Sequence, residues 1–527
     1  MKILVSDSLS EEGLKILKDV KEFQVDVKTG MKPEELKEVI KDYDALLVRS
    51  STKVTKDIVA AAGKLKVIGR AGVGLDNVDL EAATQKGIIV MNTPSGNTIS
   101  TAEHTMSLLL SMSRNIPQAN ASLKAGEWQR NKFMGVELYN KVLGIVGLGK
   151  IGSEVARRSL AFGMKVLAYD PFLSKEVAEG MGIEVVELDT LFKKSDFITI
   201  HTPMTEETKH MISDKQFVMM KKGVKVINCA RGGIIDENAL IRAVKEGKVS
   251  GAALDVFEKE PLAADSELLK LSNIVVTPHL GASTEEAQVN VAVEIAEVVR
   301  DALLGKGIRN AANYPSVEPE AYRMLKPYIE LSEKMGMFGC QLIEGRIQEV
   351  KITYSGDIIQ QDMSPLVLAL VKGLLTPILQ DTVNYINALS LAKDRGIKIQ
   401  EVRLSREEDY VNLISLDIKT DKATYSLSGT LSGNKQPRLV KVEGYYVEIA
   451  PLGFMLVAHN VDKPGIIGHL GTLLGQYNIN IAAMTFGREK PSGKAITVLS
   501  VDSPITDEIL GKIKKLEHIL FVKVIKL

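Results

Sequence analysis

Three polar residues in the first 300 positions have side chains that suit hydride transfer. Arg231 follows the apolar run VKVINCA, Glu260 lies in DVFEKEP, and His279 lies in VVTPHLGAS. A histidine can accept a hydroxyl proton at neutral pH, and a nearby carboxylate orients the imidazole and favours its protonated form. A guanidinium can hold a carboxylate through two hydrogen bonds and polarise the adjacent carbonyl. We predict that Arg231, Glu260 and His279 form the catalytic set of an oxidoreductase.

The stretch VLGIVGLGKIG, residues 142–152, predicts the cofactor. An apolar strand leads into Gly147-x-Gly149-x-x-Gly152, a turn that lets the backbone approach a pyrophosphate at a helix N-terminus. Asp170 ends the next apolar run, VLAYD, 23 residues after Gly147. Its carboxylate can accept hydrogen bonds from both ribose hydroxyls and would repel a 2′-phosphate, which favours NAD over NADP.

A second, shorter glycine turn occurs in GRAGVGLDN. Here Gly72-Val73-Gly74 follows a predicted strand, but Asn77 stands where a third glycine would be. Backbone N–H groups in such a turn can bind an anion smaller than a dinucleotide, for example a carboxylate or a phosphate. A tight turn without a ligand is the alternative.

Alternating strands and helices must position these residues. Short apolar runs alternate with helical patterns over the first 95 residues, and a second such series begins at residue 142, which predicts two parallel α/β sheets. Apolar residues at helical spacing predict long helices over 99–112 and 284–304, and the second suits a return crossing to the first domain. We therefore expect the glycine turn to belong to a cofactor domain inserted into another α/β domain.

The rest of the chain, from residue 310 onward, shows no glycine fingerprint. Residues 310–319 have the composition of a linker. Residues 320–450 mix predicted helices (365–379 and 382–396) with predicted strands (410–419, 422–431 and 439–449), as expected for an α+β domain. Residues 454–527 follow the order βαββαβ, which is typical of a ferredoxin-like fold.

Composition narrows the function classes. The 527 residues suggest three or four domains, and 66 basic against 66 acidic residues leave no net field to attract nucleic acid or a membrane surface. Cys229 and Cys340 form no CxxC pair, and the histidines show no metal-binding spacing. The apolar run 363–379 contains a lysine and two prolines, so we expect a buried helix there and a soluble, cytoplasmic protein without a metal.

The chain resembles the D-2-hydroxyacid dehydrogenase family in the segments GLGKIG, NCARGGIIDE, ALDVFEKEP and TPHLGAST. Four further segments resemble members that oxidise 3-phospho-D-glycerate with NAD, the first step of L-serine biosynthesis: VRSSTKVT, GRAGVGLDNVDLEAAT, NTPSGNT and GEWQRNKFMGVEL. The resemblance implies a Rossmann domain (97–283) inserted in a flavodoxin-like substrate domain (1–96 and 284–311). An intervening domain (312–450) and an ACT domain (451–527) are expected to follow.

The resemblance also assigns roles to single residues. It gives the catalytic roles to Arg231, Glu260 and His279. It assigns NAD contacts, with Asp255 near the nicotinamide amide, to Gly147, Gly149, Lys150, Ile151, Gly152, Asp170, Thr202, Cys229, Ala230, Asp255 and Gly281. It assigns substrate contacts, with Arg130 reaching into a neighbouring subunit, to Arg49, Arg70, Gly72, Val73, Gly74, Asn97 and Arg130. Several arginines around one substrate suit a phosphate better than a simple hydroxy acid.

The ACT-like segment implies regulation by L-serine and a homo-oligomer, either a dimer or a tetramer. Effector contacts are expected at Asn460, Asp462 and Asn480, which otherwise suit loop capping and turns. Two alternatives stay open. One is another D-2-hydroxyacid dehydrogenase that acts on glyoxylate, hydroxypyruvate or 2-oxoglutarate, and the other is a non-enzymatic NAD-sensing interaction protein built on the same fold.

Overall fold

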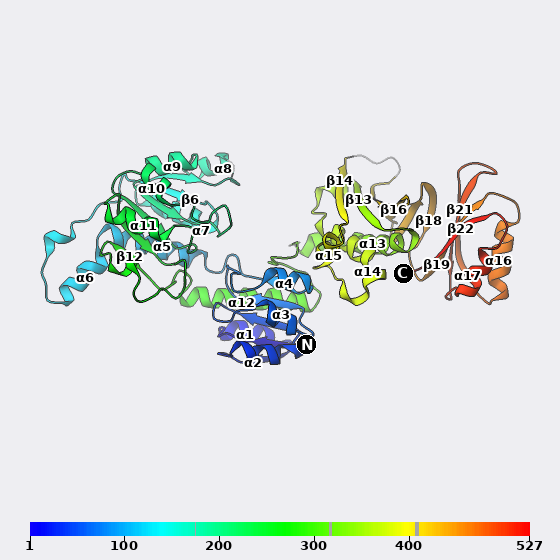
Figure 1. Cartoon of the computed structure of the whole chain (residues 1–527), viewed down its shortest axis with the longest axis horizontal. Coiled ribbons are helices and arrows are strands. Elements are labelled where there is room, and N and C mark those ends of the chain that lie inside the picture. Colours follow the sequence, from blue (N-terminus) through cyan, green and yellow to red (C-terminus); the bar gives the residue numbers. More distant parts are fainter. Residues whose placement is uncertain (174, 316–318, 406–409) are drawn as a thin grey trace.

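The computed structural model describes residues 1–173, 175–315, 319–405 and 410–527. Its strands form four sheets of five, seven, six and four strands. Figure 1 shows the sheets in separate bodies along an elongated molecule, with the green and cyan cofactor domain at one end and the red ACT domain at the other. The blue N-terminal domain and the yellow intervening domain lie between them.

The first sheet has the strand order β2-β1-β3-β4-β5 with all pairs parallel, as in flavodoxin-like folds. Its central strands are apolar runs buried on both faces, as the sequence predicts for a parallel sheet. The elements of this domain are β1 (Lys2–Val5), α1 (Glu11–Lys18), β2 (Gln24–Val27), α2 (Pro33–Val39), β3 (Ala45–Val48), α3 (Lys56–Ala61), β4 (Val67–Arg70), α4 (Leu80–Gln85) and β5 (Ile89–Met91).

Two helices connect the N-terminal domain with the cofactor domain. Helix α5 (Thr98–Ser113) enters the cofactor domain, and α12 (Glu285–Leu303) returns to pack against α1 and β4. Glycines permit the close packing of α12, because a Cβ on Gly13 would lie 2.5 Å from the carbonyl oxygen of Ala292 and one on Gly69 would lie 2.8 Å from Val299. The predicted insertion of one α/β domain into another is confirmed.

The second sheet has the order β12-β11-β10-β9-β6-β7-β8, and its pairs are parallel. This is the doubly wound Rossmann order. The chain adds β7 and β8 on one side of β6 and then adds β9 to β12 on the other side. The strands are β6 (Val142–Val146), β7 (Lys165–Tyr169), β8 (Glu184–Val185), β9 (Phe197–Ile200), β10 (Val224–Asn228), β11 (Val249–Leu254) and β12 (Ile274–Val276).

Helices cover both faces of the second sheet, and the segment after α5 projects away from it as an arm (Figure 1). The arm contains α6 (Ile116–Lys124) and the short helix η2 (Arg130–Phe133). The other helices of the domain are α7 (Lys150–Ala161), α8 (Lys175–Gly180), α9 (Leu188–Lys194), α10 (Asp214–Met219), α11 (Glu237–Lys245) and η3 (Glu267–Lys270).

Hydrogen bonds attach the first residues of the predicted linker to the first sheet. Val90 N donates to Asn313 Oδ1 (2.9 Å), and Asn313 Nδ2 donates to the carbonyl of Ile88 (2.8 Å). Residues 316–318 of the predicted linker lie outside the described part of the chain. The intervening domain follows as a six-stranded sheet, β14-β13-β15-β16-β17-β18, packed against two long helices.

Two sequence predictions in the intervening domain are wrong. The predicted strand 439–449 is two antiparallel strands, because Glu443 and Gly444 adopt left-handed φ angles of 51° and 81° and form a tight turn. The predicted helix 382–396 is helical only over Ala388–Asp394, because side chains of Asn384 and Asn387 bond backbone N–H groups before it. The elements are α13 (Pro319–Leu342), β13 (Ile347–Gly356), α14 (Ser364–Leu379), α15 (Ala388–Asp394), β14 (Lys398–Leu404), β15 (Asn412–Thr420), β16 (Thr424–Leu431), β17 (Pro437–Val442) and β18 (Tyr445–Ile449).

The C-terminal sheet has the order β20-β21-β19-β22, which is the ferredoxin-like order that the sequence predicts. Both helices cover one face, and apolar residues of the other face, such as Val457 and Ile496, join the core of the intervening domain. The elements are β19 (Phe454–Val461), α16 (Ile466–Gln476), β20 (Ile481–Arg488), β21 (Lys494–Val501), α17 (Asp507–Ile513) and β22 (Ile519–Lys526).

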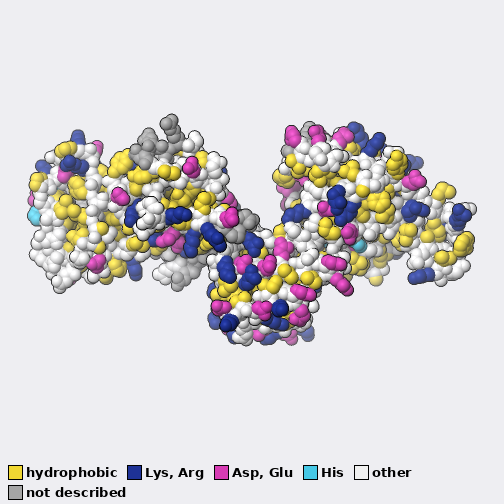
Figure 2. Space-filling view, turned by 180° about the vertical axis from the view of Figure 1, so that it is seen from behind, with side chains coloured by type: hydrophobic (Ala, Val, Ile, Leu, Met, Phe, Trp, Pro, Cys, Tyr) yellow, Lys and Arg dark blue, Asp and Glu magenta, His cyan; other side chains and the backbone are white. Residues whose placement is uncertain are grey.

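The surface carries no single-sign field on the face that Figure 2 displays, where basic and acidic side chains intermingle on each body. None of the helices in the described residues combines the length and apolarity that a membrane crossing needs. Within the same residues, no three histidine, cysteine or acidic side chains are grouped to hold a metal ion.

Candidate active site

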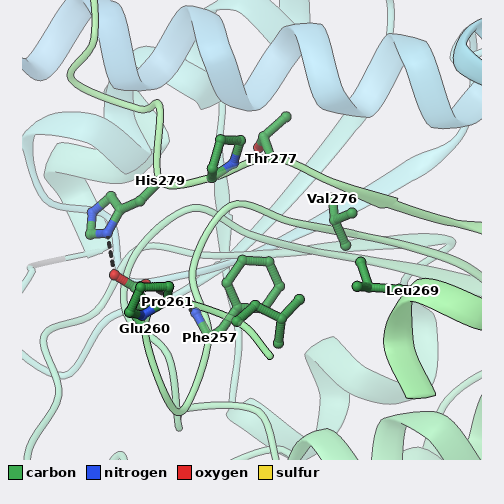
Figure 3. A pocket seen from close by; sticks show the side chains of 9 residues that line it. Phe257, Glu260, Pro261, Leu269, Val276, Thr277 and His279 are labelled. Carbon is green, nitrogen blue, oxygen red and sulfur yellow. Dashed lines mark hydrogen bonds and ion pairs between the residues drawn. The ribbon is translucent and has the colours of Figure 1, made fainter. Parts of the chain in front are cut away.

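The loops that follow β11 and β12 bring Glu260 and His279 into contact. The Nδ1 atom of His279 lies 2.8 Å from Glu260 Oε2, as the dashed line in Figure 3 marks. Glu260 Oε1 accepts a hydrogen bond from Phe257 N (3.1 Å), so the carboxylate is held from both sides. The side chain of His279 is 50% exposed, so the remaining ring nitrogen is accessible to a substrate.

A cavity of about 550 Å³ lies beside this pair. Figure 3 shows His279 and Glu260 at one end of it, with apolar side chains lining the remainder. Those side chains are Phe257, Pro261, Leu262, Leu269, Val276 and Pro278.

Arg231 follows β10, the neighbour of β11, and spans the space between the two α/β domains. Its Nε atom lies 3.1 Å from Asp76 Oδ2 in the N-terminal domain, and its Nη1 donates to the carbonyl of Ala230 (2.7 Å). The adjacent Gly232 packs against the loop of Glu260, because a Cβ there would lie 1.8 Å from the carbonyl oxygen of Phe257. The loops of all three predicted catalytic residues are therefore neighbours at one edge of the sheet.

The predicted substrate residues of the N-terminal domain lie on the facing edge of the first sheet. Arg49 follows β3, and its Nη1 donates to the carbonyl of Ser8 (3.2 Å). Arg70 ends β4 and lies against the short glycine turn, where a Cβ on Gly72 would collide with Arg70 Nη1. Burial, reinforced by the positive charge of Arg231, lowers the pKa of Arg70 to about 10. Such a cluster of arginines favours an anionic ligand.

Two buried polar atoms near this edge have no hydrogen-bond partner among the described residues. They are Nε of Arg70 and Oδ1 of Asn97, the residue that precedes α5. An unpaired buried polar group costs free energy, so each of them suits a ligand that completes its bonding.

Val73 lies between the two glycines of the short turn, and its carbonyl accepts a hydrogen bond from Asn92 Nδ2 (2.6 Å).

The long glycine turn fits a dinucleotide. Gly147 has a φ angle of 91°, and a Cβ on Gly152 would lie 2.2 Å from the carbonyl oxygen of Gly147. A Cβ on Gly149 would meet open space, so the backbone there is approachable at the start of α7. Asp170 braces the turn, because its carboxylate accepts hydrogen bonds from Leu148 N and from Phe172 N, both at 2.8 Å. Its oxygens keep capacity for further donors.

Other predicted cofactor residues differ in their environments. Ile151 and Gly152 lie in the first turn of α7, and Thr202 Oγ1 is buried without a partner among the described residues. The ammonium group of Lys150 bonds the hydroxyl of Ser95 in the other domain. Cys229 is buried, and burial raises the pKa of its thiol to about 12, so the thiol stays protonated.

Asp255 is fully buried, and protein donors occupy its carboxylate. Oδ1 accepts hydrogen bonds from Thr277 Oγ1 (2.6 Å) and Leu280 N (2.7 Å), and Oδ2 accepts one from Gly281 N (2.8 Å). The Nε2 atom of His104 also lies 3.2 Å from Oδ1. Asp255 therefore holds the backbone that follows His279 through hydrogen bonds.

Arg130 lies on the exposed arm, and its guanidinium makes no hydrogen bond or ion pair with another described residue. The three predicted effector residues are not gathered in one chain. Asp462 follows β19, whereas Asn480 precedes β20, which runs in the same direction, so the two lie at opposite ends of the sheet. Asp462 Oδ2 lies 3.4 Å from Arg488 Nη1, and Asn480 Nδ2 donates to Asp502 Oδ2 (2.7 Å).

The prediction for Asn460 requires correction. This residue lies inside β19 with no exposed surface. Its Oδ1 accepts a hydrogen bond from Thr497 Oγ1 (3.0 Å), and its Nδ2 donates to the carbonyl of Val461 (3.1 Å). Because both ends of the amide are bonded within the sheet, the side chain is not available to an effector.

Three segments of the chain match known protein families. Residues 106–281 match the NAD-binding domain of D-isomer specific 2-hydroxyacid dehydrogenases. Residues 324–443 match the D-3-phosphoglycerate dehydrogenase intervening domain, and residues 454–518 match the ACT domain. The D-3-phosphoglycerate dehydrogenase of Methanocaldococcus jannaschii is 48% identical over 528 residues, which covers all of both chains. The chain belongs to the D-3-phosphoglycerate dehydrogenase family.

Other relatives of the family span the same length. The D-3-phosphoglycerate dehydrogenase of Bacillus subtilis is 43% identical and covers 100% of this chain and 99% of its own. A solved D-lactate dehydrogenase of Aquifex aeolicus, in complex with NAD and lactic acid, is 32% identical with a TM-score of 0.54 and covers 60% of this chain and 100% of its own. The chain is an NAD-dependent oxidoreductase, as the catalytic residue types and the glycine turn predict.

Three residues in this region were not singled out from the sequence. Asp76 contacts Arg231, and His104 and Thr277 contact Asp255. A helical wheel of α5 would have placed His104 on the face that carries Thr101. Asp76 lies 155 residues before its partner Arg231, so no local sequence pattern could have indicated their contact.

Proposed function

We propose that the chain oxidises 3-phospho-D-glycerate to 3-phosphohydroxypyruvate with NAD, the first step of L-serine biosynthesis. The observation that carries this proposal is the position of Arg231, which bonds across the interdomain space to the edge where Arg49 and Arg70 lie. Three guanidinium groups from two domains suit a substrate that carries both a carboxylate and a phosphate. The names of the full-length relatives support the same substrate.

Each residue of the site has a distinct part in the proposed reaction. Arg231 holds the carboxylate and polarises the C2 oxygen, while Arg49, Arg70 and the Gly72–Gly74 turn hold the phosphate. His279 accepts the C2 hydroxyl proton through its free ring nitrogen, and Glu260 stabilises the imidazolium through the 2.8 Å contact to Nδ1. When bound, NAD supplies the hydride acceptor. The glycine turn and the start of α7 hold its pyrophosphate, and Asp170 accepts hydrogen bonds from the ribose hydroxyls.

Removal of the proposed base tests this assignment. His279→Asn keeps an amide near the position of Nδ1 but lacks the outer ring nitrogen and accepts no proton at neutral pH. We expect NADH formation to fall by about a hundredfold or more while the dissociation constant for NAD, measured by fluorescence titration, stays within twofold. Near-normal turnover in this variant would exclude His279 as the base.

We also propose a homotetramer regulated by L-serine. Asp462 and Asn480 lie at opposite ends of the ACT sheet, so an antiparallel pairing of two β20 edges would bring Asp462 of one copy near Asn480 of another. The arm offers a second self-association surface, since Trp128 and Met134, which flank Arg130, are 81% and 84% exposed. Two separate two-fold interfaces close a tetramer. A mass of four chains in light scattering is expected, and a mass of one or two chains would contradict this assembly.

A further inference from the structure

One face of α5 braces the segment that carries His279. Thr101 Oγ1 donates to the carbonyl of Gly281 (3.1 Å), and His104, one turn later, directs Nε2 toward Thr277 Oγ1 and Asp255 Oδ1, at 3.2 Å from each. Residues three apart on a helix share a face, so α5 contacts the segment on both sides of His279.

The hydrogen-bond roles around His104 follow from its neighbours. Thr277 Oγ1 lies 2.6 Å from the carboxylate of Asp255 and gives its single proton to that group. The Nε2 atom of His104 therefore faces two acceptors, the hydroxyl oxygen and the carboxylate, and must carry a proton. Burial alone would raise the pKa of Asp255, but hydrogen bonds from His104, Thr277 and Leu280 N lower it, which keeps the carboxylate ionised as an acceptor.

The same carboxylate fixes the backbone next to the catalytic histidine. Asp255 accepts hydrogen bonds from the N–H groups of Leu280 and Gly281, the two residues that follow His279. His279 itself has a left-handed φ angle of 56°, which is uncommon for a residue with a Cβ. Without these anchors the backbone would gain freedom, and the imidazole would lose its alignment.

We propose that His104 is a positioning residue for hydride transfer, which holds His279 in its reactive orientation through Asp255 and Thr277. His104 acts through other residues, because its side chain contacts Asp255 and Thr277 and not Glu260 or the ring of His279. The inference rests on the proposed function only in that His279 is the base. A general base must lie within hydrogen-bond reach of its proton, and a displacement of about 1 Å costs about a hundredfold in rate.

Three variants of the full-length chain separate positioning from packing. His104→Leu removes the donor, and His104→Gln replaces it with an amide N–H of similar reach. Glu103→Gln is the matched control on the neighbouring position of α5, since Glu103 is exposed and faces Arg158 (3.5 Å). For each variant we would measure kcat for NADH oxidation, the kinetic isotope effect with NADH deuterated at the transferred position, the dissociation constant for NADH and the melting temperature.

We expect His104→Leu to lower kcat by about tenfold to a hundredfold and to enlarge the isotope effect, because the chemical step becomes slower than product release. His104→Gln should recover most of the rate, and Glu103→Gln should match the wild type. All three variants should bind NADH within twofold of the wild-type constant.

Two results would overturn the inference. One is a kcat for His104→Leu within twofold of the wild type. The other is an equal loss in the Leu and Gln variants together with lower melting temperatures and weaker NADH binding, which would mean a packing role. The assay uses whichever of 3-phosphohydroxypyruvate and hydroxypyruvate the wild type reduces faster. A wild type that prefers hydroxypyruvate would contradict the proposed substrate and still leave this test valid.

Discussion

Arg231 and Asp76 form an ion pair across the interdomain space, with Nε and Oδ2 3.1 Å apart. The pair joins a loop of the cofactor domain to the segment that follows the short glycine turn of the N-terminal domain. In the proposed reaction the substrate carboxylate takes Arg231 as its partner, so Asp76 competes with the substrate for the same guanidinium. The strength of this competition can be measured.

Asp76→Asn should lower the KM for 3-phospho-D-glycerate by about two- to fivefold, since partly exposed ion pairs contribute about 0.2–1 kcal/mol. The effect should shrink at high salt, because exposed charges are screened. Initial rates at several substrate and salt concentrations give the comparison. Asp57→Asn on α3 is the control, because this exposed acidic residue lies outside the arginine cluster. A raised KM in Asp76→Asn would mean instead that Asp76 orients Arg231 for the substrate.

Removal of the buried Asp255 charge should destabilise the cofactor domain in a pH-dependent way. The amide of Asp255→Asn cannot accept from all the donors that the carboxylate serves, and we expect a loss of about 2–3 kcal/mol at pH 7. The folded-state pKa of Asp255 is lowered, so its stabilisation is present above the unfolded pKa of about 4 and is lost as the pH falls through the folded value.

Calorimetry between pH 7 and pH 3 tests this prediction. The relevant transition is the one that NAD shifts to higher temperature, since a ligand stabilises the domain that binds it. The wild type and Asp255→Asn should differ most at neutral pH and converge in acid. A difference that is constant with pH would show that the carboxylate charge does not cause the stabilisation.

The effector proposal predicts complementation between two chains. Asp462→Ala and Asn480→Ala should each remove inhibition by L-serine, because every serine site then lacks one of its two contact residues. In a mixed oligomer of the two variants, one site of each ACT pair combines an intact Asp462 with an intact Asn480 from the other chain. Serine inhibition should therefore return in part. A mixture that stays insensitive while the two chains demonstrably co-assemble would contradict a site shared between subunits.

The sequence predicts most of the fold because its signals are local. Apolar runs buried on both faces gave the parallel strands, and glycines at Gly147 and Gly152 marked a turn where a Cβ would not fit. The predicted helix over 382–396 was too long because the side chains of Asn384 and Asn387 bond nearby backbone groups, which competes with helix formation. The tight turn at Glu443 and Gly444 is local, and its left-handed preference could have been recognised.

The site is less predictable than the fold. The residue types at Arg231, Glu260 and His279 indicate the chemistry, because strand ends of one parallel sheet meet at one edge. The Arg231–Asp76 pair depends on how two domains meet, and the bonding of Asn460 depends on the neighbouring strand, whose Thr497 donates to its Oδ1. Neither relationship has a signal in the local pattern.

The rate of NADH oxidation with 3-phosphohydroxypyruvate, compared with hydroxypyruvate under the same conditions, tests the central claim most directly. The two keto acids differ only in the phosphate, which the arginine cluster is proposed to bind. If it does, kcat/KM should favour the phosphorylated acid by at least about a hundredfold, since hydrogen bonds to charged groups contribute about 1.5–3 kcal/mol each. Equal rates, or a preference for hydroxypyruvate, would contradict the assignment of the substrate.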